Sequence, residues 1–268
     1  MTPRLFFALF NTEMRKRMSY RLDFWVTTIL IFISAVLIPW FFWGAIYAQA
    51  PGEEINGYTL KEMLLYVCVA ILVGRLVRGA EHVEDVQDDI YQGSLNRYLL
   101  FPANYLSMKY PQHLGGLLPN MLQVFLFLPL VVWVVGDTAN ISPLSVLMAI
   151  PMILLANLLY YLLVFPLQTV AFWADNVWSL MVMVRMCANL LGGAMIPLAL
   201  FPESTAQVLR YLPFACFFDL PVRTMLGQCG PVEYLRGIAL CLVWSAILYL
   251  VGRLVWQRGE RSYTGVGI

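Results

Sequence analysis

Residues Glu81 to Lys109 hold the side chains of this chain whose types and spacing could do chemistry. The segment opens with five carboxylates, Glu81, Glu84, Asp85, Asp88 and Asp89. Val83, Val86 and Ile90 recur among them at helical spacing, which predicts a short helix with one apolar and one acidic face, ended at Gly93. Such a helix is typical of a surface that docks on a partner protein.

The motifs of common catalytic and metal sites are absent from the sequence. Its two histidines, His82 and His113, belong to no HExxH pair and to no Cys/His cluster at ligand spacing. No lysine completes a GxxxxGK[ST] phosphate loop, and no GxSxG elbow is present. We therefore expect no metal site, no bound cofactor and no nucleotide-hydrolysing activity of its own. Asp88 and Asp89 are the candidates for acid–base chemistry if the chain were an enzyme.

Composition places the chain in a membrane. Sixty per cent of its 268 residues are hydrophobic, 12% are charged, and the mean hydropathy is +0.72. A water-soluble core of ordinary size cannot bury that much apolar surface, and a helix that crosses a bilayer needs about 20 apolar residues. The net charge of +1 and the dispersed basic residues give no sign of a nucleic-acid partner.

The hydropathy pattern predicts an all-α integral membrane protein with six transmembrane helices in a single domain, residues 1–268. The expected spans are residues 24–48, 58–77, 114–135, 143–174, 177–201 and 235–252. The second is the least apolar, because Lys61, Glu62 and Arg75 lie at its ends. The fourth is longer than a bilayer requires, so it must tilt, kink at a proline or run partly along the interface.

The distribution of lysine and arginine predicts how these spans are oriented in the membrane. With both termini inside, twelve basic residues lie in cytoplasmic segments and four, Lys61, Arg210, Arg223 and Arg236, lie outside. The twelve are Arg4, Arg15, Lys16, Arg17, Arg21, Arg75, Arg78, Arg97, Lys109, Arg253, Arg258 and Arg261. Because cytoplasmic loops carry the excess of basic residues, both termini and the segment 81–109 are expected in the cytoplasm.

Residues 1–22 are expected to form an amphipathic helix lying on the inner leaflet. Their basic residues follow the apolar ones, and the first span is too long for the apolar part of a cleavable signal. Two interpretations remain open for this helix. It transmits motion to the first span as a lever, or it only anchors the chain.

The segment 202–234 is too apolar for an exposed loop, and its apolar patch is too short to cross the bilayer. We expect a re-entrant helical hairpin that dips from the outer face, since broken backbone at membrane depth is tolerated when it is buried in protein. A surface amphipathic loop is the alternative. The candidate outer-gate residues are Phe214, Phe217, Phe218, Asp219 and Arg223. The last two are four residues apart and are expected to pair along one helical face.

Few polar residues lie within the predicted spans. Arg185 and Asn189 share a helical face, and together with Asn157 they are candidates to line a substrate pathway, because intramembrane polar groups usually face a wet cavity or the bundle interior. Contacts between helices are the alternative role. Cys216 and Cys229 both fall on the predicted outer side, either as buried thiols or as a disulfide.

The whole arrangement resembles the permease of a type-2 ABC exporter. The shared features are a basic amphipathic start, six spans, a cytoplasmic helix after the second span and a re-entrant segment before the last. The local motif QGSLNRYLLFP, Gln92–Pro102, is similar to a pattern that follows the second span in one branch of that family. The family usually has a basic residue before the proline, where this chain has Phe101.

The resemblance implies several partners and roles. A separate ABC ATPase subunit would hold ATP and Mg²⁺, and a second permease chain, the same or homologous, would complete a pathway within the membrane lipid. The transported substrate would be lipid-linked, a glycan or drug-like, and the location a plasma membrane, expected to be a bacterial inner membrane. The expected ATPase-coupling residues are Val83, Glu84, Asp85, Val86, Asp88, Asp89, Ile90 and Arg97.

Two other classes of protein fit the sequence less well. A membrane-embedded lipid-modifying enzyme would need acid, base or metal groups that converge near an interface, and no second motif accompanies Asp88 and Asp89. An ion-coupled secondary transporter usually shows inverted repeats and intramembrane acids, and neither is evident in this sequence.

Overall fold

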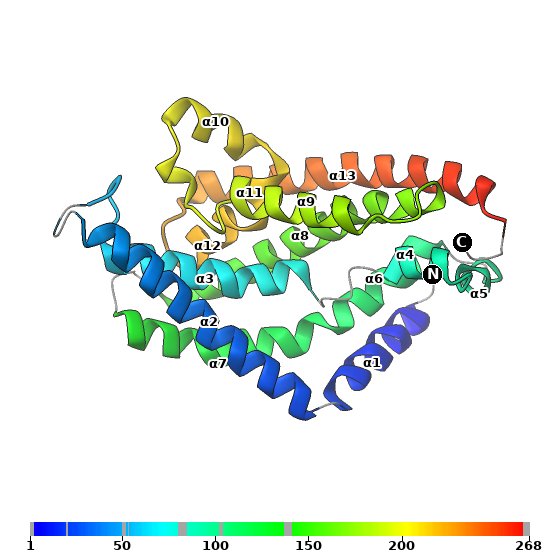
Figure 1. The fold of residues 1–268 in the computed structure, drawn as a ribbon, viewed down its shortest axis with the longest axis horizontal. Coiled ribbons are helices and arrows are strands. Elements are labelled where there is room, and N and C mark those ends of the chain that lie inside the picture. Colours follow the sequence, from blue (N-terminus) through cyan, green and yellow to red (C-terminus); the bar gives the residue numbers. More distant parts are fainter. Residues whose placement is uncertain are drawn as a thin grey trace.

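The computed structural model describes residues 3–19, 21–49, 52, 54–79, 85–101, 104–136 and 141–264. Over these residues the regular structure is helical, apart from one isolated bridge between Ile55 and Tyr58. The prediction of an all-α protein is therefore confirmed. Figure 1 shows an elongated bundle with α4, α5 and the end of α13 at one extremity and the end of α2 near the other, while α10 projects from the upper side.

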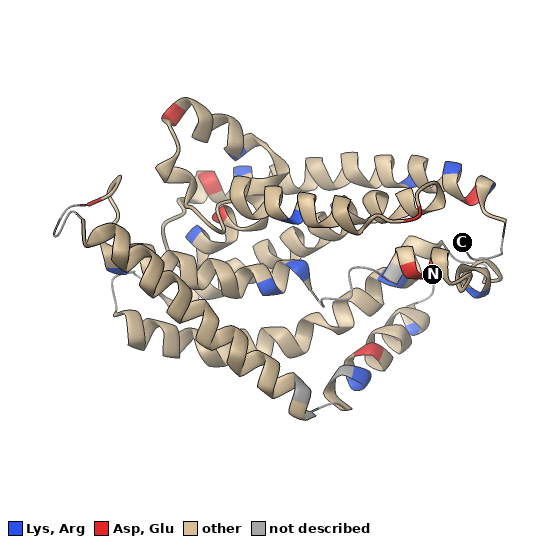
Figure 2. Ribbon diagram, viewed as in Figure 1, with Lys and Arg blue, Asp and Glu red and all other residues tan. Residues whose placement is uncertain are grey.

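Four helices in the described part of the chain are long and apolar enough to cross a membrane. They are α2 (Arg21–Tyr47), the pair α6 (Tyr105–Gly115) and α7 (Leu117–Val135), α8 (Pro143–Gln168) and α13 (Pro231–Ser262). The middle stretches of α2 and α7 carry no charged residue in Figure 2. This apolar surface belongs to a membrane protein, as composition predicted.

The other two predicted spans correspond to shorter or less apolar helices. Helix α3 (Leu60–Arg78) has 19 residues, about 28 Å at 1.5 Å per residue, close to the thickness of the hydrocarbon core. Its charged residues lie at its two ends. At the N-terminal end, Thr59 and Glu62 form a capping box. Helix α9 (Trp178–Leu191) has 14 residues. The count of six spans stays a prediction.

Helix α3 lies at the centre of the bundle. It contacts α2, α7, α8 and the short helix α12 (Asp219–Met225). From Met63 to Ala70 every residue is buried, including the ring of Tyr66. A helix surrounded in this way must be apolar on all faces, which is why its sequence reads as a span in spite of its charged ends.

Three predicted boundaries differ from the observed helices. The apolar block 177–201 is not one helix, because α9 ends at Leu191 before Gly192 and Gly193, and the latter has a φ of 85° that other residues rarely adopt. Block 143–174 ends in a 3₁₀ turn, η1 (Thr169–Phe172). The last helix runs ten residues beyond the predicted boundary at 252, to Ser262.

The segment 202–234 forms three short helices. Helix α10 (Glu203–Tyr211) is amphipathic and projects from the bundle, while α11 (Pro213–Phe217) and α12 pack inward against α8. Phe217 and Phe218 are fully buried between them. The re-entrant interpretation accounts for α11 and α12 better than for α10, and it stays a prediction.

Helix α1 (Pro3–Ser19) packs against α6 in addition to its contact with α2. The contact is close at Gly115, where an added Cβ would come within 2.6 Å of the carbonyl oxygen of Phe10. The helix expected at the membrane interface is therefore also held by α6 of the same chain. Sequence periodicity could not reveal this, because the contact depends on a missing side chain about a hundred residues away.

We predict that Gly115→Ala destabilises the protein by forcing α1 away from α6. Gly44→Ala is the matched control, since Gly44 lies in α2 with nothing within 4 Å of the added Cβ. Alanine exceeds glycine in helix propensity by about 1 kcal/mol, so the control should be neutral or stabilising. The measurement is the thermal midpoint of each purified variant in detergent. Equal midpoints for both variants would contradict the close α1–α6 contact.

Candidate functional site

The predicted amphipathic helix exists as α4 (Asp85–Tyr91), and it lies against η1 and the end of α8. Val86 and Ile90 are buried, as their spacing predicted. They belong to a cluster completed by Leu95, Tyr105, Phe165, Ala171, Phe172, Val177 and Trp256. Val83 and Glu84 lie outside the described residues, as does the side chain of Asp85. Gly93 follows the helix with a φ of 70°, which confirms the predicted stop.

Two hydrogen bonds tie α4 to the segment that ends the fourth predicted span. The side-chain oxygen of Gln168, the last residue of α8, accepts a hydrogen bond from the backbone amide of Val86 at 3.0 Å. First-turn amides have no partner within a helix, so Gln168 acts as its cap. At the other end, the hydroxyl of Tyr91 donates to the carbonyl of Ala174 at 2.8 Å. Helix α4 is therefore held at both ends.

The carboxylate of Asp89 is buried, contrary to its expected place on the exposed acidic face. Its Oδ2 lies 2.6 Å from the Nζ of Lys109 and accepts a hydrogen bond from the hydroxyl of Tyr105 at 2.7 Å. Its Oδ1 accepts one from Ser94 at 2.6 Å. Asp89 follows Val86 by three residues, so it shares the apolar face, and Lys109 offsets the cost of burying it there.

These contacts keep Asp89 ionised. Burial by itself raises the pKa of Asp89, but the hydrogen bonds from Lys109, Ser94 and Tyr105 outweigh it and leave the pKa below its ordinary value. The Nζ of Lys109 also lies 4.7 Å from the ring centroid of Tyr98 in α5 (Leu95–Leu99). One ion pair thus connects α4, α5 and α6.

The aromatic ring of Tyr105 extends this connection to α13. It stacks on Trp256 with centroids 4.5 Å apart and planes at 12°. Trp256 in turn contacts the rings of Phe165 and Phe172. An added Cβ at Gly259 would meet the ring of Phe172 at 2.0 Å, so the end of α13 lies directly on η1. We call this assembly around Asp89 the Asp89 network.

The surface of the segment 85–101 that remains exposed is mixed in character. Asp88 and Gln92 are exposed, and Arg97 lies 3.5 Å from Asp89 with two-thirds of its side chain exposed. Beyond them lie Leu100 and Phe101, which are 86% and 59% exposed. Sequence reasoning missed this apolar tip, although three apolar residues in a row within a polar segment were a signal for it.

A second polar cluster lies at the other end of α3. The hydroxyl of Tyr66 donates to Oδ1 of the buried Asp219 at 3.0 Å, and Arg223 lies 3.7 Å from Oδ2. The predicted pair between Asp219 and Arg223 is therefore confirmed. Arg223 has a further partner that the sequence did not reveal, Glu233 in α13, at 3.0 Å. Phe214 is half-buried beside Phe217.

The three pathway candidates lie in different surroundings. Asn157 is fully buried, and its amide group donates to the carbonyls of Leu76 and Val77 at 3.1 and 3.2 Å. It thus caps the end of α3, which is the helix-contact role that the sequence left open. Asn189 accepts a hydrogen bond from Arg78 at 2.8 Å. Arg185 is exposed on α9, without an ion-pair partner among the described residues.

The five cysteines are free thiols. Cys216 and Cys229 are therefore not joined by a disulfide in this structure. Cys216 is a buried thiol, as one alternative expected, whereas Cys229 is only half-buried.

The family model of the ABC-2 family transporter protein matches residues 31–267. The chain belongs to this family. It is the membrane permease of an ABC transporter and a multi-pass membrane protein, as the sequence resemblance implied. No match to a curated protein was found for the chain.

Family membership gives the helix that follows α3 a clear context. An ABC permease generally works with an ABC ATPase, and a permease must pass the motion of such a partner into its spans. The Asp89 network joins an exposed surface to α6, α8 and α13 through contacts between buried residues. The site as a whole therefore connects an exposed surface with three of the long helices.

We predict that Asp89→Asn and Lys109→Met each destabilise the permease by about 3 kcal/mol, because each leaves one buried charge without its partner. The double variant should recover most of that loss. Asp88→Asn is the matched control, an exposed carboxylate on the same helix, and should change the stability by less than about 0.5 kcal/mol. Denaturant or thermal unfolding in detergent gives the four values. If the double variant lost as much stability as the two single variants added together, this result would contradict a direct coupling of Asp89 to Lys109.

Proposed function

We propose that the permease exports or flips a lipid-linked, glycan or drug-like substrate, with ATP and Mg²⁺ bound by a separate ATPase subunit. The observation that carries the proposal is the connection of α4 to three membrane helices at once. Gln168 links α4 to α8, Lys109 links it to α6, and Trp256 brings α13 into the same network. A push on the exposed side of α4 would therefore move all three.

The proposed docking surface consists of Asp88, Gln92, Arg97, Leu100 and Phe101. All five are exposed, and they combine both signs of charge with an apolar tip. A fitting groove on the ATPase would hold a pocket for the two apolar side chains and complementary charges at its rim. Of the coupling residues expected from the sequence, Asp89 is not part of this surface, because it is paired with Lys109, and Glu84 and the side chain of Asp85 lie outside the described residues.

Helix α9 is the proposed contact with a second permease chain and with the pathway. Its exposed side carries Met183, Met186 and Leu190 beside the exposed Arg185. An arginine that faced lipid alone would be costly, so a wet pathway or a second chain is the favoured surrounding. The guanidinium of Arg185 forms a hydrogen bond with Tyr160 but has no ion-pair partner in the described part of the chain, which also favours a substrate with an anionic group, such as the phosphate of a lipid-linked molecule.

The proposed orientation places both termini and the Asp89 network in the cytoplasm, within a six-span chain of a bacterial inner membrane. The excess of basic residues in the segments at that end supports it. The cluster of Tyr66, Asp219 and Arg223 then lies toward the outer face, where α11 and α12 would act as an outer gate.

The coupling proposal predicts that Asp88→Lys combined with Leu100→Asp abolishes transport and releases the ATPase. The first change reverses an exposed charge and the second puts a charge into the apolar contact, and each should weaken the complex at least tenfold. Glu260→Lys is the control, since Glu260 is an exposed acid near the same end of the molecule but on α13. Co-purification with the ATPase and substrate-stimulated ATP hydrolysis are measured. Full retention of the ATPase by the double variant would refute docking on this surface.

The gate proposal predicts that Asp219→Ala and Tyr66→Phe reduce transport several-fold to a similar degree. Each removes one partner of the same buried hydrogen bond, while Arg223 keeps Glu233. Co-purification with the ATPase should be unchanged, because the two sites lie at opposite ends of α3. Transport is measured in vesicles together with ATPase retention. Normal transport by both variants would favour the alternative of a structural surface segment.

A further inference from the structure

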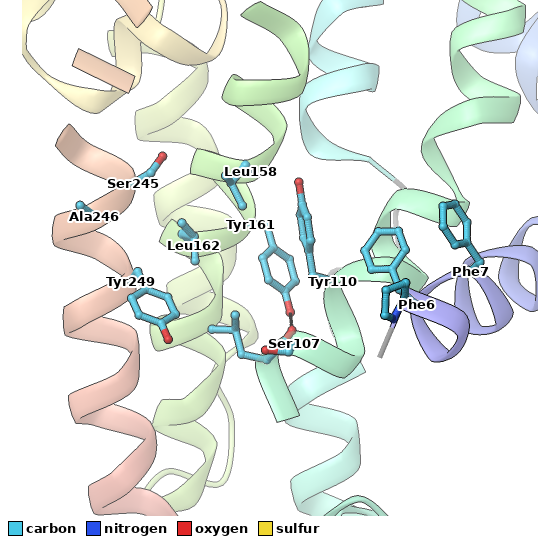
Figure 3. Close-up of a pocket in the computed structure, with 12 residues that line it drawn as sticks. Phe6, Phe7, Ser107, Tyr110, Leu158, Tyr161, Leu162, Ser245, Ala246 and Tyr249 are labelled. Carbon is cyan, nitrogen blue, oxygen red and sulfur yellow. Dashed lines mark hydrogen bonds between the residues drawn. The ribbon is translucent and has the colours of Figure 1, made fainter. Parts of the chain in front are cut away.

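A cavity of about 650 Å³ lies among α1, α6, α8 and α13, apart from both sites described above. Its walls are largely apolar, with Phe6 and Phe7 from α1 facing Leu158 and Leu162 from α8 (Figure 3). The rings of Tyr110 and Tyr161 lie side by side at its centre, with centroids 5.1 Å apart. Its volume is within the range of cavities that hold small organic ligands.

Four hydroxyl groups line this cavity without a hydrogen-bond partner in the described part of the chain. They belong to Ser107, Tyr110, Ser245 and Tyr249. Ser245 is only 7% exposed, and its Oγ is a buried atom with no partner. Tyr161 differs, since its hydroxyl donates to the carbonyl of Leu106 at 3.1 Å. Buried polar groups are normally satisfied, so the buried Ser245 hydroxyl indicates a ligand that supplies an acceptor, and the more exposed hydroxyls of Ser107, Tyr110 and Tyr249 lie where they could donate to the same ligand.

Two arginines lie close in sequence to residues that line the cavity. Arg4 is adjacent to the lining residue Pro3, and Arg253 lies one helical turn beyond Tyr249 on α13. Both are exposed, and neither has an ion-pair partner among the residues described. The cavity thus offers an apolar wall, a group of hydroxyls and a cationic edge.

We propose that this cavity binds one glycerophospholipid of the leaflet in which α1 lies. An acyl chain would occupy the apolar wall, the ester oxygens would accept from the hydroxyls, and the phosphate would meet Arg4 and Arg253. The source of the ligand is the membrane, because α8 and α13 are membrane-crossing helices whose outer faces expose Leu154, Leu242 and Leu250. The site does not depend on the proposed direction of transport.

The bound lipid would affect the position of the Asp89 network through its contacts with α6. Tyr110 lies beside Lys109 in the same helix, and the carbonyl of Leu106 accepts the hydrogen bond from Tyr161. An occupied cavity would therefore hold α1, α6 and α8 together next to the coupling contacts. Its role is that of a structural lipid.

The test measures how much phospholipid the full chain retains. The chain is first purified from membranes in detergent and is then exchanged into vesicles of phosphatidylglycerol and phosphatidylethanolamine. Native mass spectrometry should show one phospholipid per chain after detergent washing. Ala246→Trp fills the cavity from an exposed position on its wall and should lower the retained phospholipid at least tenfold. Val243→Trp, an equally exposed position outside the lining, is the control and should retain it.

A milder pair of variants covers the case in which Ala246→Trp fails to fold. Ser245→Ala with Tyr110→Phe removes two hydroxyls, keeps the cavity shape and should weaken phospholipid retention several-fold. Equal retention by these variants and the wild type, or an adduct without phosphorus such as detergent or fatty acid, would overturn the proposal. None of these measurements involves the ATPase, so a failure here is distinct from a failure of the coupling proposal.

Discussion

The buried ion pair between Asp89 and Lys109 is the interaction on which the arrangement of α4, α5 and α6 depends. Removing two charges from water costs several kcal/mol each, and their attraction repays this only when the remaining polar atoms are also satisfied. Ser94 and Tyr105 satisfy the carboxylate, and the ring of Tyr98 lies beside the lysine. The pair therefore imposes one geometry on the whole segment between α4 and α6.

This constraint fixes the arrangement of α4, α5 and α6 beside helices that are mainly apolar. Apolar helices in a membrane gain little by burying their faces, because lipid is equally apolar, so polar contacts between helices carry much of the specificity. The described structure places such contacts near both ends of α3. Asn157 caps its last carbonyls, Arg78 binds Asn189, and Tyr66 holds Asp219 toward the other end.

The same arrangement explains which sequence expectations were met. Val86 and Ile90 are buried, Gly93 ends the helix, and Asp219 pairs with Arg223, because each of these depends on residues within one or two helical turns. Asp88 and Asp89 are neighbours in sequence and were treated alike. The structure exposes the first and buries the second, since successive residues of a helix point about 100° apart.

The sequence by itself determined the membrane class of the protein and the position of α4, since composition, apolar run lengths and local periodicity are properties of the chain alone. Only the tertiary structure decided that Gln168 caps α4, that α1 packs on α6 at Gly115, and that Ser245 faces a cavity. Val86 and Gln168 are 82 residues apart in the chain. Side chains so distant have no pattern that relates them, and they meet only because the apolar helices between them pack in one arrangement.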